Sequence, residues 1–256
     1  MRIVRFHGPM GAAVYGLAER GTVTPLRNAP WETGGVPLPA TEPVEARALA
    51  LLTPCVPGKV LGIGRNYLAH ARELGNEVPA EPLVFLKPPS ALLPHEGTVL
   101  LPKEAGRVDY EGELALVIGR RARRVPKDGW RDVLFGLTVA LDISARDLQK
   151  KDGQWWRAKG YDTFCPLGPS IETGVDPSDL LLETRVDGEL RQSARTSDMI
   201  FDVGTVIAHV SAAMTLEPGD VILTGTPEGV GPLSPGQTVT VTIERVGTLS
   251  VKVAAE

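Results

Sequence analysis

Tyr110-Glu-Gly-Glu-Leu-Ala-Leu-Val-Ile118 is an apolar, strand-like run that carries two glutamates, Glu111 and Glu113, on either side of a glycine. Alternate residues of a strand point to the same face, so the two carboxylates share a face that continues as apolar. The opposite face is apolar as well, which predicts a strand buried on both sides. Asp142 repeats the anomaly near the end of a second apolar run, 134–143.

Three carboxylates in apolar strands indicate a bound cation. An ionised carboxylate that leaves water costs several kcal/mol, roughly, unless it is paired or coordinates a metal. If Glu111, Glu113 and Asp142 converge, the absence of a nearby histidine favours a hard, oxygen-preferring ion: Mg²⁺ first, then Mn²⁺ or Ca²⁺. The alternative is that the two glutamates form an exposed edge-strand face and Asp142 caps the following helix. The spacing alone leaves both interpretations open.

Composition excludes several classes of function. The 256 residues suffice for one large domain, or a small domain and a larger one. A balance of 27 Lys and Arg against 31 Asp and Glu, with both signs scattered, predicts no nucleic-acid partner and no anionic-membrane partner. No apolar run is long enough to cross a membrane, and the start lacks the apolar core of a signal peptide. Two cysteines without CxxC spacing fit a reducing compartment, so we expect a cytoplasmic protein without thiolate zinc.

The chain divides at the breaker-rich stretch 53–58, Thr-Pro-Cys-Val-Pro-Gly. We expect a small N-terminal region over residues 1–56, with strands at 3–6 and 13–17 and a short helix at 44–52. Residues 57–256 then form the main domain.

The main domain reads as mainly β with a few helices, an α+β class. Its apolar runs are mostly short, rich in Val, Leu and Ile, and bounded by Gly and Pro. Helices are predicted at 66–74, with Asn66 as the cap, at 144–150, with Ser144 opening a capping pattern, and at 200–214. The predicted strands are 60–63, 83–86, 98–101, 114–118, 134–143, 220–223, 238–243 and 249–253.

Several polar side chains have the types and spacing of a catalytic site. Arg146 and Gln149 lie three apart on a predicted helix, hence on one face, and both are suited to binding a carboxylate. His70 and Glu73 are also three apart, and a carboxylate bonded to an imidazole strengthens it as a base. Lys159, in a loop-like segment, could neutralise developing enolate charge. The alternatives are that Arg146 and Gln149 lie on an ordinary surface helix and that Lys159 is a solvated lysine of a loop.

The segment 223–232, Leu-Thr-Gly-Thr-Pro-Glu-Gly-Val-Gly-Pro, is a glycine- and proline-rich loop directly after a strand. Such a loop brings backbone N–H groups and the Thr226 hydroxyl close to a ligand carboxylate. It lacks the Lys-Ser/Thr ending of a phosphate loop, which argues against nucleotide binding.

Taken in order, these segments resemble the fumarylacetoacetate hydrolase family. The resemblance covers about residues 58–256, and its motifs are jointly far more specific than any one of them. The matching stretches are Gly64-Arg65-Asn66-Tyr67 with His70, Phe85-Leu86-Lys87-Pro88, Glu111-Gly112-Glu113, Asp142-Ile-Ser-Ala-Arg146-Asp147-Leu-Gln149, Lys159 with Asp162 and Phe164, Gly188-Glu-Leu-Arg191-Gln192, Asp198-Met199-Ile200-Phe201, and Thr224-Gly225-Thr226-Pro227-Glu-Gly229-Val-Gly231.

The resemblance implies a mixed β-roll, usually dimeric, and we therefore expect a homodimer. It also implies that a divalent ion, Mg²⁺ in first place, chelates a small 2-oxo acid substrate. By the same resemblance, the ion would be held by Glu111, Glu113 and Asp142. His70 and Glu73 would form the catalytic dyad, with Lys159 nearby. The substrate would be bound by Arg65, Arg146, Gln149, Asp162 and Thr226.

The reaction is predicted less sharply than the site. Family isomerases, hydrolases and decarboxylases share a metal-stabilised enolate, and the chain most closely resembles the single-domain relatives of 2-hydroxyhepta-2,4-diene-1,7-dioate isomerase, an enzyme of aromatic-compound catabolism. An acylpyruvate hydrolase or an oxaloacetate decarboxylase is the alternative that the His70 and Glu73 pair favours. A non-catalytic metal- or ligand-binding β-domain is the alternative from another class.

Overall fold

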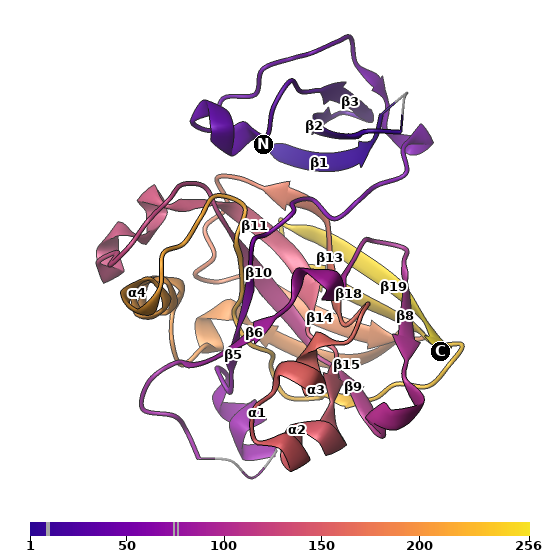
Figure 1. Cartoon of the computed structure of the whole chain (residues 1–256), viewed down its shortest axis with the longest axis vertical. Helices are drawn as coiled ribbons and strands as arrows, with labels where there is room; N and C mark the ends of the chain where they lie inside the picture. The colour runs from indigo at the N-terminus through magenta and orange to yellow at the C-terminus, as the bar shows by residue number, and fades with distance from the viewer. Residues whose placement is uncertain (9–10, 74, 76) are drawn as a thin grey trace.

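The computed structural model describes residues 1–8, 11–73, 75 and 77–256. Strands dominate it and helices are few, which confirms the predicted fold class (Figure 1). The helices are α1 (Leu68–Glu73), α2 (Arg146–Asp152), α3 (Trp156–Gly160) and α4 (Val203–Ala213). The strands are β1 (Arg2–His7), β2 (Ala13–Glu19), β3 (Thr22–Pro25), β4 (Val44–Glu45), β5 (Val60–Gly64), β6 (Leu83–Lys87), β7 (Leu92–Leu93), β8 (Thr98–Leu101), β9 (Val108–Tyr110), β10 (Gly112–Ile118), β11 (Leu134–Leu141), β12 (Ser144–Ala145), β13 (Cys165–Glu172), β14 (Leu181–Val186), β15 (Glu189–Arg195), β16 (Val221–Leu223), β17 (Gly231–Pro232), β18 (Thr238–Ile243) and β19 (Gly247–Ala255).

The largest sheet has the order β4-β3-β2-β1-β13-β11-β10-β16-β5-β6, with β7 paired to β13. Strand β10 lies inside it, between β11 and β16, and every residue of β10 is buried. Leu114 and Leu116 belong to one hydrophobic core and Ala115 and Val117 to another. The prediction of a strand buried on both faces is therefore confirmed, and the edge-strand alternative is wrong.

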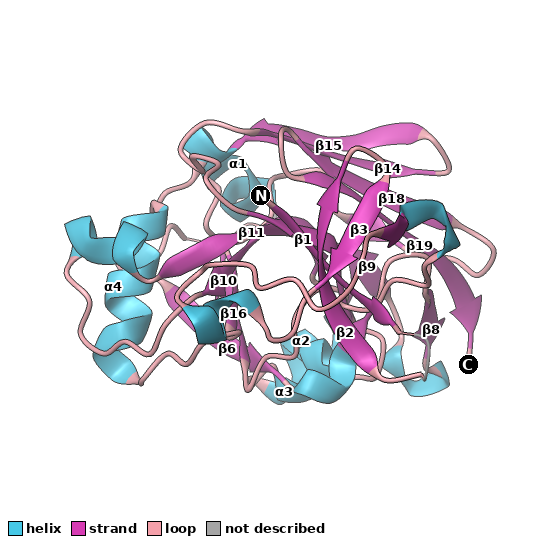
Figure 2. Cartoon of the chain, turned by 90° about the horizontal axis from the view of Figure 1, so that it is seen from above, coloured by secondary structure: helices cyan, strands magenta, loops and turns pink. Residues whose placement is uncertain are grey.

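A second sheet, β15-β14-β18-β19-β8, packs against the first. Leu182, Val241 and Leu249 of this sheet lie in the same hydrophobic core as Leu114 of β10. The helices lie around the edges of the two sheets, and α2 and α3 pack side by side (Figure 2). None of the helices among the described residues is long and apolar enough to cross a membrane.

The N-terminal strands extend the large sheet at one end of the molecule (Figure 1). Strand β1 pairs antiparallel with β13, with Ile3 opposite Ile171. Val4, Phe6 and Val23 form a small core of their own beside it. The division into residues 1–56 and 57–256 stays a prediction.

Two helix predictions differ from the structure in kind or extent. Residues 44–52 do not form a helix: Val44–Glu45 is strand β4, paired with β3, and only Ala46–Ala48 makes a 3-10 turn. Ala46, Leu49 and Leu51 reach the small N-terminal core but are only partly buried, which is too little packing to hold a longer helix in place. Helix α4 starts at Val203 because Asp202 is its N-cap and accepts the Thr205 N–H at 2.8 Å.

Two predicted helix caps have other roles. The Asn66 side chain accepts from the Phe201 N–H at 2.7 Å and donates to the Thr224 carbonyl at 2.7 Å, so it joins three segments, and α1 begins at Leu68. Residue 74, the predicted end of that helix, lies outside the described residues. Ser144 lies in strand β12, and α2 begins at Arg146 without a side-chain cap.

Candidate active site

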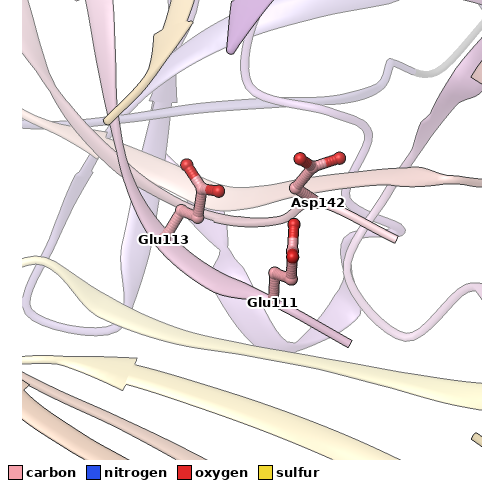
Figure 3. Close-up of side chains that lie close together, drawn as sticks. All are labelled: Glu111, Glu113 and Asp142. Atoms are coloured by element: carbon pink, nitrogen blue, oxygen red, sulfur yellow. The ribbon is translucent and has the colours of Figure 1, made fainter. Parts of the chain in front are cut away.

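The three predicted metal ligands converge in the structure. Glu111, Glu113 and Asp142 each offer an oxygen, and these atoms lie within 4.8 Å of one another. Figure 3 shows the three carboxylates directed toward a common space from two neighbouring segments. All three side chains are buried, with Asp142 fully so.

The strand register explains this convergence. Glu111 lies in the break between β9 and β10, and Gly112 is opposite Leu141 in the antiparallel β10–β11 pair. Asp142 therefore follows β11 directly beside Glu111, and its N–H donates to the Glu111 carbonyl at 2.9 Å. Neighbouring strands lie about 5 Å apart, which is the spacing that brings these carboxylates together.

Two buried lysines bond to these carboxylates. Lys159 donates to Glu111 at 2.7 Å and also bonds to Asp142, while Lys87 donates to the other Asp142 oxygen at 2.5 Å. Lys159 lies on α3, not in the loop that the sequence suggested. Its ammonium is 4.7 Å from the centre of the Phe85 ring, which adds a favourable cation–π contact.

Arg146 holds Glu111 from the other side. Its guanidinium bonds to Glu111, donates to Asp109 at 2.9 Å, and donates to the Gln149 side-chain oxygen at 3.0 Å. The predicted shared face of Arg146 and Gln149 is thus present on α2. Two of its three nitrogens bond to protein carboxylates, so Arg146 positions Glu111 and Asp109.

The two glutamates differ in charge environment. Burial raises the pKa of Glu111, but the Arg146 and Lys159 charges outweigh it and hold that pKa well below its usual value. Burial, followed by repulsion from Asp142 and Glu111, raises the pKa of Glu113 well above its usual value. Glu113 therefore has the largest need for a further cation.

The residues fit a hard divalent ion. Three carboxylates supply oxygen ligands only, and the Lys159 ammonium bonded to two of them shows that the space accepts a cation. A bound ion would also compensate the charge of Glu113, whose one hydrogen-bond donor among the described residues is the Gly225 N–H, at 2.6 Å.

The glycine-rich loop at 224–231 supports the carboxylates from a third direction. Gly225 adopts a positive φ of 99°, and its N–H points at Glu113. The Thr226 hydroxyl donates to the Gly112 carbonyl at 2.9 Å and accepts from the Gln192 amide at 2.8 Å. Gln192 also accepts the Gly112 N–H at 3.0 Å, so Gln192 and Thr226 together fix the backbone between the two glutamates.

Helix α1 lies at the pocket with the predicted dyad. His70 is buried and lines the pocket, and its Nδ1 is 3.4 Å from a Glu73 oxygen. Glu73 also accepts the Gly229 N–H at 3.1 and 3.2 Å, which ties α1 to the glycine-rich loop. Burial lowers the pKa of His70, against the opposing charges of Glu111 and Glu73, and so favours the neutral ring.

One cavity of about 280 Å³ collects almost all of the predicted site residues. Arg65 lines it at the start of the α1 segment, half-buried and with a positive φ of 57°. Glu73 does not line the cavity itself but contacts His70, which does. The lining includes Arg65, His70, Glu111, Glu113, Asp142, Arg146, Gln149, Lys159 and Thr226.

Asp162 is the exception. It lines a separate surface depression with Glu104 and Glu256. The chain turns away from the carboxylate cluster after α3, where Thr163 has a positive φ of 70°. The structure therefore does not bring Asp162 to the pocket, contrary to the sequence expectation.

Four buried polar residues organise the site but were not predicted as site residues: Lys87, Asp109, Ser144 and Gln192. Ser144 donates to Glu111 and accepts from Lys159 at 2.6 Å. Lys87 ends an apolar strand, so the buried-charge argument used for Glu111 would have identified it. Gln192 gives no such signal, because it lies in a strand whose other residues are mostly exposed.

Comparison with known proteins agrees with this geometry. The family model described as fumarylacetoacetate (FAA) hydrolase C-terminal matches residues 59–254. The solved structure of 2-hydroxyhepta-2,4-diene-1,7-dioate isomerase from Mycobacterium marinum is 44% identical, with a TM-score of 0.91 over 100% of this chain and 99% of that one. The mitochondrial oxaloacetate tautomerase FAHD1 of Arabidopsis thaliana is 50% identical over 188 residues, which are 71% of this chain and 84% of the relative.

A third relative was solved with ligands. Maleylpyruvate hydrolase from Sphingobium, in complex with manganese(II) and pyruvate, is 33% identical, with a TM-score of 0.81 over 100% of this chain and 99% of that one. The family match spans far more than half of the chain and includes the carboxylate cluster, the dyad and the glycine-rich loop. The chain therefore belongs to the fumarylacetoacetate hydrolase family.

Proposed function

We propose that this protein moves a proton between the enol oxygen and a carbon atom of a 2-oxo, or 2-hydroxy-dienoic, dicarboxylic acid. The first candidate reaction is that of 2-hydroxyhepta-2,4-diene-1,7-dioate isomerase. The observation that carries the proposal is a buried His70 paired with Glu73 on the same cavity as three converging carboxylates. A base beside a cation site is what enolate chemistry requires.

The metal site has one role in this proposal. When bound by Glu111, Glu113 and Asp142, a divalent cation, Mg²⁺ in first place, acts as a Lewis acid toward the oxygens of the 2-oxo acid. The maleylpyruvate hydrolase relative supports this assignment, because its structure holds manganese(II) together with pyruvate.

The chain's own residues supply binding and proton transfer. Arg65 lines the cavity, and in this proposal its guanidinium binds the C1 carboxylate. The enol hydroxyl gives its proton to neutral His70, and Glu73 stabilises the resulting imidazolium. In the isomerase reaction a proton returns to C5 while the C2 oxygen becomes a carbonyl and the remaining double bond shifts to C3–C4. Lys159 holds a positive charge close by, since Asp142 and Glu111 outweigh burial and raise its pKa.

Oxaloacetate tautomerisation is the second candidate. The Arabidopsis relative with that name is 50% identical to this chain. The reaction needs the same groups, since a proton leaves the enol oxygen and one is added at C3. It differs from the first candidate only in the carbon that receives the proton.

The test is a set of assays on the purified protein. We expect the ultraviolet absorbance of 2-hydroxyhepta-2,4-diene-1,7-dioate to fall with Mg²⁺ present and to persist after chelation by EDTA. Enol-oxaloacetate tests the second candidate in the same way. Release of acetate from acetylpyruvate, or of CO₂ from oxaloacetate, without proton transfer on either enol would replace the proposal by a hydrolase or decarboxylase. Turnover of none of these compounds would favour the non-catalytic alternative.

The dyad predicts a pH profile. Because burial lowers the pKa of His70 from its ordinary value of 6.5, we expect kcat/KM to fall only as the pH drops below 6.5, where the ring becomes protonated. Glu73 opposes this shift, so Glu73→Gln should move the acid limb to still lower pH. The glutamine keeps an oxygen for the Gly229 N–H, so α1 should stay in place. An acid limb that is the same in both proteins would exclude Glu73 as the partner of His70.

The homodimer also remains a proposal. Light scattering of the purified protein would test it, since a mass of about 27.3 kDa would indicate a monomer.

A further inference from the structure

Four lysine and arginine side chains among the described residues line the cavity, and they differ in what they already bind. Arg146 and Lys159 form ion pairs with Asp109, Glu111 or Asp142. Lys150 and Arg65 form no ion pair with any carboxylate among the described residues. The cavity therefore has two cations that protein carboxylates do not neutralise.

The position of Lys150 on α2 distinguishes it from the other three. Arg146 is 7% exposed and lies against Glu111, whereas Lys150, one turn further along α2, is exposed and still lines the cavity. The next residue, Lys151, is exposed as well but does not line it. Lys150 thus lies at the outer rim of a cavity whose buried inner end holds the carboxylate cluster.

We infer that Lys150 binds the distal carboxylate of the substrate and makes the site selective for dicarboxylic over monocarboxylic 2-oxo acids. The inference rests on the proposed function, in which the C1 carboxylate and 2-oxygen occupy the inner end. A substrate held in that orientation directs its far end toward the rim of the cavity. There, an ammonium group without a protein carboxylate partner attracts the distal carboxylate of a dicarboxylic acid. It has no such attraction for the terminal methyl group of a monocarboxylic acid.

The experiment compares two unreactive probes of nearly equal length, 2-oxoglutarate and 2-oxopentanoate, which differ in the distal carboxylate. Calorimetric titration with Mn²⁺ present should show tighter binding of 2-oxoglutarate to the parent protein. Lys150→Gln should weaken 2-oxoglutarate binding by about tenfold, the size of a well-placed charged contact, and leave 2-oxopentanoate binding unchanged. Lys150→Arg keeps the charge and should keep the preference.

Lys151→Gln is the matched control. It removes the same charge from the neighbouring residue, whose side chain does not line the cavity. It should bind both probes as the parent protein does. Equal weakening of both probes by Lys150→Gln, no weakening of either, or the same effect from Lys151→Gln would overturn the inference. So would a parent protein that binds neither probe.

The binding assay separates this inference from the proposed reaction. A protein that prefers 2-oxoglutarate through Lys150 but isomerises neither enol would retain the selectivity assignment and lose the reaction. A protein that isomerises the dienol but shows no effect of Lys150→Gln on 2-oxoglutarate binding would retain the reaction and lose the assignment.

Discussion

Replacing Glu113 by glutamine should abolish divalent-cation binding and lower turnover by about a hundredfold or more. Lewis-acid stabilisation of developing charge lowers the activation free energy by roughly several kcal/mol, and about 1.4 kcal/mol of that free energy is a factor of ten in rate. Glutamine keeps the shape of the side chain and an oxygen for the Gly225 N–H, so the loop should remain in place. Titration with Mn²⁺, followed by calorimetry, measures the loss of binding directly.

The stability of the same variant gives a second readout that does not depend on turnover. Burial and the charges of Asp142 and Glu111 raise the pKa of Glu113, so the ionised side chain opposes folding at neutral pH. Without metal, Glu113→Gln should therefore unfold at a temperature equal to or above that of the parent protein. With Mn²⁺ at a hundred times its Kd, the parent protein should gain about 2.7 kcal/mol and the variant nothing.

Asp220→Asn is a suitable control, because Asp220 is fully buried but bonds to Lys59 and to the Glu217 N–H, outside the cavity. It should lower the melting temperature and leave the Mn²⁺-dependent rise intact. If Mn²⁺ raises the melting temperature of Glu113→Gln as much as that of the parent protein, Glu113 is not a ligand.

The carboxylate cluster was predictable because its physical signal is local. An ionised side chain in a strand that is apolar on both faces is anomalous in any fold. The pairing of β10 with β11 then brings Asp142 beside Glu111, and this pairing needs only two neighbouring antiparallel strands. Helical spacing was sufficient in the same way for Arg146 with Gln149 and for His70 with Glu73.

Which distant segments meet the carboxylate cluster was not predictable, even where a residue such as Lys87 carries the local signal of a buried charge. Lys87 reaches Asp142 from β6, and Gln192 reaches Gly112 from β15, across separations of 55 and 80 residues. Strand β14 alternates buried residues with more exposed ones, and β15 is mostly exposed. Both therefore lack the continuous apolar runs on which the strand prediction relied. Asp162 shows the opposite error, since closeness in sequence to Lys159 does not place it in the same cavity.

Gly112→Ala should destabilise the fold by several kcal/mol, roughly, although alanine is a small change and Gly112 needs no unusual φ. A Cβ at residue 112 would lie 2.1 Å from the Thr184 hydroxyl oxygen and 3.2 Å from the Gln192 side-chain oxygen. Both neighbours are buried, so neither can move into solvent. We expect the loss in denaturant unfolding, and Mn²⁺ binding should weaken because Glu111 and Glu113 flank the displaced backbone.

Thr184 provides the control that separates this clash from a general loss of flexibility. Its buried hydroxyl has no hydrogen-bond partner among the described residues, so Thr184→Ala alone removes a poorly satisfied polar group and should cost little. The same change also removes the atom that the new Cβ would meet. The double variant should therefore recover most of the stability lost in Gly112→Ala and regain Mn²⁺ binding. If the two changes had additive effects on the free energy of unfolding, the packing of β10 against β14 would not explain why residue 112 is a glycine.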